Sequence, residues 1–164
     1  MRLLVLGLDN AGKTTVLRKI MGEEINFVMP TQGFNIKSFN DNGVKINVWD
    51  IGGQKAIRKH WKNYFDQTDV LMYVIDATDR IRLEEWLEEL QTLLEEDELS
   101  GIPLLFFANK QDLVTALEPE EIVDELQLDE IDDRDWSIFG WSALSGEGLD
   151  EGMQWMTDHI KIKE

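Results

Sequence analysis

The segment from Gly7 to Thr14 has the residue types and spacing that phosphate binding requires. It fits the pattern G-x-x-x-x-G-K-[ST], and it lies between a short apolar run and a helical segment, where such a loop must lie. The glycines let the backbone curl around an anion, so that N–H groups and a helix N-terminus face it. Lys13 can neutralise β- and γ-phosphate oxygens, and the Thr14 hydroxyl can ligate magnesium. We therefore expect a nucleotide as the ligand.

A second polar segment, from Phe107 to Asp112, predicts which base the nucleotide carries. The Asp112 carboxylate can accept hydrogen bonds from the ring N–H and the exocyclic amine of guanine, a pair of donors that adenine lacks. Asn109 can bond the other edge of the ring, and the stem of Lys110 can lie over it. After the last expected strand, the tripeptide Ser142-Ala143-Leu144 can offer a backbone N–H to the guanine oxygen.

Two segments between these motifs have the groups needed to sense a third phosphate. Asp50 ends an apolar run and is expected to hold magnesium through water. Gly53 can bring a backbone N–H against the γ-phosphate, and Gln54 can orient the attacking water. Thr31 lies in a loop, where its hydroxyl can complete the magnesium shell only when the γ-phosphate is present. The competing interpretation of the segment from Asp50 to Gln54 is a fortuitous turn, and that of Thr31 is a solvent-exposed loop threonine.

Apolar runs of strand length recur along the chain with helical segments between most of them. Runs that are apolar on both faces are typical of a parallel sheet covered by helices, so the sequence predicts a doubly wound α/β fold. The helical period is clearest over residues 83–94, where leucines three and four apart share one face against acidic residues. The expected strands are Leu3 to Leu6, Gly33 to Phe39, Val44 to Ile51, Val70 to Ile75, Leu104 to Ala108 and Trp136 to Trp141.

The second and third expected strands break the parallel pattern. Only Asn40, Asp41, Asn42 and Gly43 separate them, which is a hairpin turn signal rather than a crossover. We therefore expect six strands, mostly parallel, with one antiparallel edge strand. The length of 164 residues and the apolar fraction of 43% suit one domain over residues 1–164.

Composition and charge exclude several classes of protein. There is no Cys, so disulfides and thiolate metal sites are excluded, and a cytoplasmic protein is the simplest interpretation. The net charge of −17 argues against nucleic-acid binding as the main activity. Basic residues outnumber acidic ones 12 to 9 up to residue 82, whereas acidic residues lead 24 to 4 beyond it. The acidic runs over 84–98 and 118–135 are interpreted as solvated surface.

Taken together, these motifs resemble the Arf family of small GTPases across essentially the whole chain. The resemblance rests on Gly7 to Thr15, the Pro30-Thr31 pair, Trp49 to Gln54, and Asn109 to Asp112. It implies a P-loop NTPase fold, a GTP-binding switch, slow GTP hydrolysis, Mg²⁺ as cofactor, and GTP or GDP as the bound nucleotide. The nucleotide-binding positions that match are Gly7, Asp9, Asn10, Ala11, Gly12, Lys13, Thr14, Thr15, Thr31, Gly53, Asn109, Lys110, Asp112, Ser142, Ala143 and Leu144, with Thr14, Thr31 and Asp50 for magnesium and Gln54 for catalysis.

The resemblance also implies partners. They are an activating protein that supplies an arginine, a guanine-nucleotide exchange factor, and effectors that carry lipid-modified cargo, often toward cilia. Phe34, Trp49 and Tyr64 match an aromatic triad that meets effectors, although strand residues of this kind are otherwise expected in the core. Expected locations are the cytoplasm, the cilium and the Golgi.

The start of the chain departs from the family pattern. Members carry an N-terminal amphipathic helix, often acylated, whereas this chain begins six residues before Gly7, and Arg2 offers no myristoylation site. We therefore expect no stable membrane contact for this chain.

Two other functions stay open on the sequence. A P-loop enzyme acting on a small substrate would need a lid, and no arginine-rich lid segment is evident. A scaffold that binds nucleotide but does not cycle would be favoured if Gln54 or Thr31 were replaced, and both are present.

Overall fold

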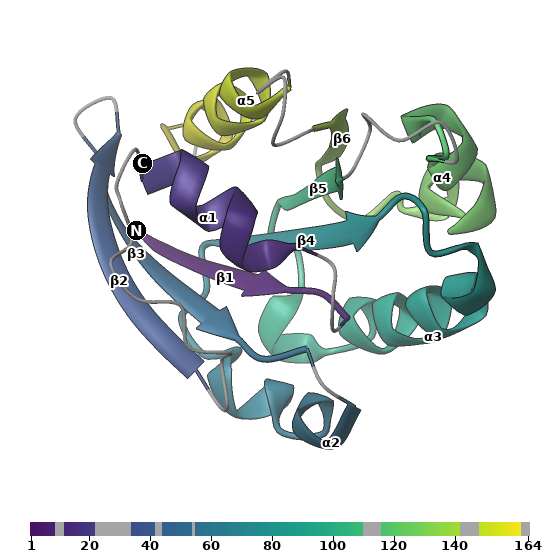
Figure 1. The fold of residues 1–164 in the computed structure, drawn as a ribbon. Coiled ribbons are helices and arrows are strands. Elements are labelled where there is room, and N and C mark those ends of the chain that lie inside the picture. The colour runs from purple at the N-terminus through teal and green to yellow at the C-terminus, as the bar shows by residue number, and fades with distance from the viewer. Residues whose placement is uncertain are drawn as a thin grey trace.

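A six-stranded sheet forms the centre of the molecule in the computed structural model, which describes residues 1–8, 12–21, 34–41, 44–53, 55–109, 116–141 and 148–161 (Figure 1). The strands are β1 (Arg2–Leu6), β2 (Phe34–Asp41), β3 (Val44–Ile51), β4 (Val70–Asp76), β5 (Leu104–Asn109) and β6 (Trp136–Gly140). They lie in the order β2-β3-β1-β4-β5-β6, and every neighbouring pair is parallel except β2 with β3. The predicted α/β fold, its six strands and the antiparallel edge are confirmed.

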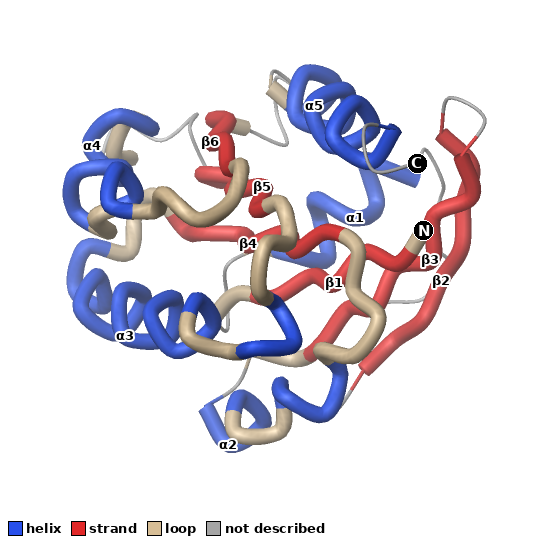
Figure 2. The backbone as a smooth tube through the Cα atoms, turned by 180° about the vertical axis from the view of Figure 1, so that it is seen from behind, coloured by secondary structure: helices blue, strands red, loops and turns tan. Residues whose placement is uncertain are grey.

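Helices cover both faces of this sheet. In the two opposite views, α1 and α5 lie on one side and α2 and α3 on the other (Figures 1 and 2). The α-helices are α1 (Lys13–Met21), α2 (Lys55–Arg58), α3 (Leu83–Leu94), α4 (Pro119–Glu125) and α5 (Leu149–Lys161), and the 3₁₀ turns are η1 (Trp61–Tyr64), η2 (Arg80–Arg82), η3 (Asp97–Leu99) and η4 (Leu128–Glu130). None of the helices in the described ranges is long and apolar enough to cross a membrane.

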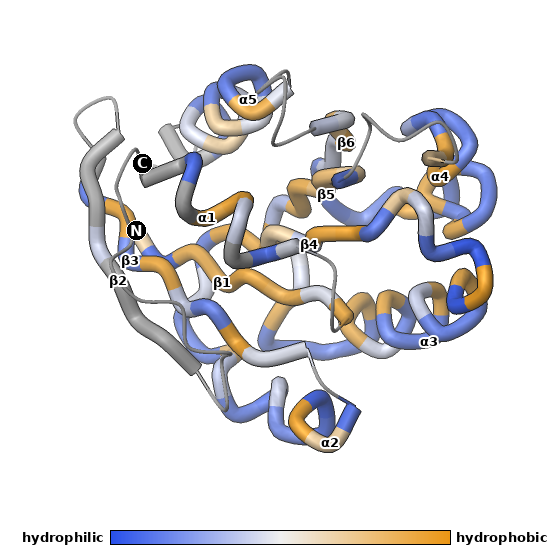
Figure 3. The backbone as a smooth tube through the Cα atoms, viewed as in Figure 1, coloured by the Kyte–Doolittle hydropathy of each residue, from blue (hydrophilic) through white to orange (hydrophobic). Residues whose placement is uncertain are grey.

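The core lies where the central strands meet the helices. Every residue of β4 and β5 is buried, and so are residues 3–6 of β1. Residues 3–6, 70–75 and 104–108 of these strands are apolar, while the helices carry many hydrophilic residues (Figure 3). A strand that is covered on both faces has no solvent side, which explains the unbroken apolar runs in the sequence.

The helix predicted from leucine spacing is α3, but its buried stripe differs from the leucine row. Its buried side chains are Trp86, Leu90 and Leu93, and the other leucines of the row are half-buried. Glu85 and Glu89 lie at the margin of this stripe, with side chains 29% and 28% exposed. The expectation that this whole acidic run is solvated surface is therefore wrong at these two glutamates, because both lie beside Arg58 at the end of α2.

The register of the parallel strands brings the ends of β1, β3, β4, β5 and β6 to one edge. Val5 pairs with Asp50, and Asp76 pairs with Asn109. β1 is the strand from which the chain builds the sheet in both directions, because its neighbours are β3 on one side and β4 on the other. In open α/β sheets, ligands bind at the carboxyl ends of the strands next to such a reversal.

Candidate nucleotide-binding site

Lys13 joins the phosphate loop to the end of β3. It is the first residue of α1, and its ammonium lies 3.1 Å from Asp50 Oδ1, with both side chains only 10% exposed. The same Nζ donates a hydrogen bond to the carbonyl oxygen of Ile51. A nearly buried ammonium needs such partners, because an unpaired charge away from water is costly. The contact places the predicted phosphate ligand beside the predicted magnesium ligand.

Gly12 brings the phosphate loop against the loop that is predicted to read the base. Its φ of +87° lies in the left-handed region, which favours glycine. A Cβ placed on it would come within 3.0 Å of Asn109 Nδ2 and 3.3 Å from Asn109 Cγ. Asn109 ends β5 and is only 4% exposed. Two motifs almost a hundred residues apart therefore touch.

The end of β6 lies next to the same place. The Trp141 N–H donates to the Ala108 carbonyl at 2.9 Å, so the residue before the predicted Ser142 segment is fixed beside β5. Gly148, with φ +88°, packs so closely on the Gly140 carbonyl that no Cβ would fit. Both flanks of the segment 142–147 are thus held at the edge where Asn109 lies.

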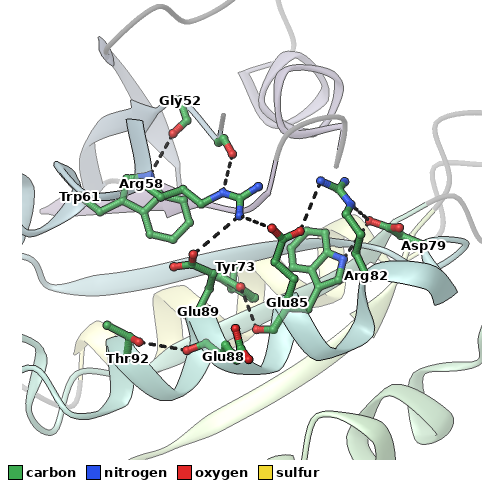
Figure 4. A network of polar contacts seen from close by, with 12 residues as sticks. Gly52, Arg58, Trp61, Tyr73, Asp79, Arg82, Glu85, Glu88, Glu89 and Thr92 are labelled. Carbon is green, nitrogen blue, oxygen red and sulfur yellow. Dashed lines mark hydrogen bonds and ion pairs between the residues drawn. The ribbon is translucent and has the colours of Figure 1, made fainter. Parts of the chain in front are cut away.

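Two side chains fix the backbone after β3. The Trp61 indole Nε1 donates to the Gly52 carbonyl at 2.9 Å, and the Arg58 Nε donates to the Gly53 carbonyl at 2.8 Å (Figure 4). Both donors are buried, with Arg58 7% and Trp61 2% exposed. No motif in the sequence predicted a role for either residue. The signal that could have found them is the pair Arg58 and Trp61, three residues apart shortly after Gln54. A second part of it is the pair Glu85 and Glu89, whose spacing of four places both on one helix face.

Two of the three aromatic residues predicted to meet effectors, Trp49 and Tyr64, are neither fully exposed nor fully buried. Trp49 and Tyr64 are half-buried, and their ring centroids lie 6.4 Å apart at an interplanar angle of 48°. The Arg2 guanidinium lies 3.9 Å from the centroid of the Trp49 ring, and Arg2 Nη2 donates to the Tyr64 carbonyl at 3.0 Å. Phe34 pairs with Ile51 across the β2–β3 ladder, and its side chain is not among those described.

Several predicted site residues lie outside the described part of the chain, and their roles stay predictions. The side chain of Thr14 is likewise outside it, whereas Thr15 is described and exposed and Gly7 directly follows β1. Among the described residues no group of three His, Asp or Glu side chains could hold a metal by itself. Magnesium usually takes one or two carboxylates with waters and phosphate oxygens, which fits Asp50. The residues outside the described ranges are Asp9, Asn10, Ala11, Thr31, Gln54, Lys110, Asp112, Ser142, Ala143 and Leu144.

Comparisons with known proteins identify the family to which this chain is similar. The sequence model of the ADP-ribosylation factor family matches residues 1–160. ADP-ribosylation factor-like protein 3 of Chlamydomonas reinhardtii is 57% identical over 160 residues, which cover 98% of this chain and 90% of that protein. The protein of the same name from Caenorhabditis elegans is 49% identical over 161 residues, covering 98% and 88%.

A solved structure extends the similarity to the fold. The Arl6 (BBS3) small GTPase from Trypanosoma brucei, with the nucleotide analogue GppNp bound, superimposes with a TM-score of 0.91 at 32% identity and covers 100% of this chain and 99% of its own. Within the family, the segment from Pro30 to Ser38 and the acidic helix after Arg80 also favour the factor-like protein 3 subgroup, with protein 2 as the second candidate.

Proposed function

Because this chain belongs to the ADP-ribosylation factor family of small GTPases, we propose that it is a GTP-binding molecular switch whose GTP form captures effectors. The observation that supports this most directly is the close packing of Gly12 on Asn109. It brings the loop predicted to hold phosphates against the loop predicted to read guanine, so that one nucleotide could contact both loops.

The residues at this edge can divide the work of phosphoryl transfer. Lys13, held beside Asp50 at 3.1 Å, supplies a nearly buried positive charge for the phosphate oxygens. Gly53 offers its N–H to the γ-phosphate, and Gln54 orients the water that attacks it. Asp50, Thr14 and Thr31 would hold Mg²⁺, which when bound neutralises charge on the β- and γ-phosphates.

We infer that hydrolysis by the isolated protein is slow. Phosphoryl transfer gains roughly 10³ to 10⁵-fold from an arginine that reaches the transferring phosphate. Arg58 is the arginine nearest to Gln54 in sequence, but its guanidinium is committed to Gly53 and Glu85, and its side chain is only 4% exposed. This supports an activating protein that supplies the cation from outside, with an exchange factor to reload the nucleotide.

The proposed effectors are carriers of lipid-modified cargo, which release it when the GTP form binds. The proposal rests on the family resemblance, with relatives named ADP-ribosylation factor-like protein 3. The proposed location is the cytoplasm, with ciliary or Golgi association, and it rests on the resemblance alone. The half-buried pair Trp49 and Tyr64 offers an aromatic surface beside β2 for such a contact. A switch favours a partner only by the difference in affinity between its two states, so the GTP form must bind the carrier more tightly than the GDP form. The alternative is a scaffold of the same fold that binds nucleotide without cycling.

The test of guanine recognition is competition against a fluorescent GDP on the purified protein. GTP should displace the probe far better than ATP. In Asp112→Asn the amide replaces a double acceptor with one acceptor and one donor, so preference should move from guanine toward xanthine nucleotides. The matched control is Asp129→Asn, because Asp129 is an exposed aspartate in η4, away from the site.

Each outcome bears on one part of the proposal. Equal competition by ATP and GTP would refute guanine specificity, and unchanged selectivity in Asp112→Asn would remove Asp112 from the site. Single-turnover hydrolysis, measured with and without candidate activators, separates the switch from the scaffold. The scaffold would hydrolyse no GTP under either condition.

A further inference from the structure

The two glycines after β3 have their carbonyl groups held from one side. Trp61 donates its indole N–H to the Gly52 carbonyl, and Arg58 donates its Nε–H to the Gly53 carbonyl (Figure 4). Trp61 is 2% exposed, and the bond from Arg58 lies in buried surroundings, so water competes little for either carbonyl. Glycine has the widest range of backbone conformations, and these bonds remove much of that freedom.

The two bonds fix the orientation of the Gly53 N–H. A peptide group is planar and trans, so its C=O and N–H point in opposite directions. The Gly52 carbonyl and the Gly53 N–H belong to one peptide group, and Trp61 holds the carbonyl end of it. Arg58 holds the next peptide group at the Gly53 carbonyl. Gly53 is therefore clamped on both sides, with its N–H directed away from the Trp61 indole.

The buried charge of Arg58 is compensated by α3. Arg58 Nη1 lies 3.0 Å from Glu85 Oε1 and 3.6 Å from Glu89 Oε1. These glutamates are four residues apart, so both face the same side of the helix. Glu85 also lies 3.8 Å from Arg82, whose Nε is paired with Asp79 at 2.7 Å. A carbonyl alone would leave the guanidinium charge uncompensated, and the glutamates remove that penalty.

We propose that Arg58 and Trp61 are positioning residues for the third phosphate, and that α3 sets the position of Arg58 through Glu85 and Glu89. This rests on the proposed function, in which the Gly53 N–H meets the γ-phosphate. The clamp makes that N–H available in one orientation before the nucleotide arrives, so GTP does not bear the entropy of ordering it. GDP has no γ-phosphate and gains nothing from the clamp. The clamp thus sets how strongly the protein prefers GTP over GDP.

Two conservative variants test the clamp. Arg58→Lys keeps the positive charge but replaces the separate Nε and Nη1 donors by a single ammonium, which does not reproduce their geometry. Trp61→Phe keeps a buried aromatic ring and removes only the donor. The control is Arg82→Lys, which alters the same charge network without touching Gly52 or Gly53. Dissociation constants for GDP and for the GTP analogue GppNp are measured for each variant, together with the melting temperature of the GDP form.

In both clamp variants we expect the affinity ratio of GppNp to GDP to fall by roughly tenfold, the scale of one well-oriented hydrogen bond. GDP affinity should stay near that of the unaltered protein, and Arg82→Lys should keep the full ratio. The melting temperature of the GDP form should fall in both clamp variants, because each loses a buried hydrogen bond. An equal fall in both affinities, or an unchanged ratio in either variant, would overturn the proposal. Failure of the unaltered protein to bind either guanine nucleotide would instead refute the proposed function.

Discussion

Replacing Gly12 by alanine would test whether the two nucleotide loops depend on each other. Gly12 has φ +87°, and an added Cβ would come within 3.0 Å of Asn109 Nδ2, far inside ordinary van der Waals contact. Asn109 has little room to retreat, because it is 4% exposed and its backbone pairs with Asp76 in the sheet. The substitution therefore adds two separate costs, one from backbone conformation and one from overlap.

Gly101 separates these two costs. It also has a left-handed φ, +73°, but a Cβ there would meet nothing within 4 Å. Gly101→Ala should lose only the conformational term, about 1 to 2 kcal/mol of unfolding free energy. Gly12→Ala should lose that term and a further ~1 to 3 kcal/mol from overpacking. For a chain of this length, each kcal/mol lowers the melting temperature by about 2 to 4 °C.

The assay combines urea unfolding with guanine-nucleotide affinity. Gly101→Ala should bind nucleotide normally. Gly12→Ala should bind at least about tenfold more weakly, since a displaced Asn109 side chain would lose its proposed hydrogen bond to the base. Equal unfolding free energies and equal affinities in Gly12→Ala and Gly101→Ala would show that the overlap with Asn109 carries no cost and that the two loops are independent.

Three further substitutions have distinct expected results. Gln54→Leu should bind GTP normally and hydrolyse it roughly 100-fold more slowly; full activator-stimulated turnover in single-turnover assays would mean that another residue positions the water. Tyr64→Ala should weaken carrier binding by about 2 kcal/mol or more. Because the Tyr64 ring is half-buried, the Tyr64→Ala variant should also lose roughly 1 to 2 kcal/mol of stability, well below the cost of removing a core aromatic. Unchanged carrier affinity by titration calorimetry would mean that Tyr64 contributes to packing alone. Tyr73→Phe tests pH dependence: burial, reinforced by the nearby Glu89 charge, raises the pKa of Tyr73 above its ordinary value of 10.0. The stability from the neutral phenol is therefore full below pH 10.0 and falls as pH rises toward the folded-state pKa, by about 1.4 kcal/mol per pH unit. Urea midpoints for Tyr73→Phe should fall less steeply in that range, and equal slopes would contradict the assignment.

Much of the fold follows from local sequence patterns. A strand covered on both faces must be apolar throughout, so the runs at residues 3–6, 70–75 and 104–108 identify the central strands directly. The polar residues between Phe39 and Val44 are too few for a crossover, which makes β2 antiparallel to β3, although β2 itself extends through Asp41. The phosphate loop is also local, because its glycines and lysine act within one strand-to-helix turn.

Contacts between distant segments were decided only by the tertiary structure. Spacing in the sequence does not indicate that Gly12 packs on Asn109, since this depends on strand order and register. The acidic pattern of α3 predicts a solvated face, and only the approach of α2 makes Glu85 and Glu89 the partners of Arg58. A charged side chain on a helix is stable either in water or beside an opposite charge. The sequence of α3 does not show where α2 lies, so it does not show which of these applies to Glu85 and Glu89.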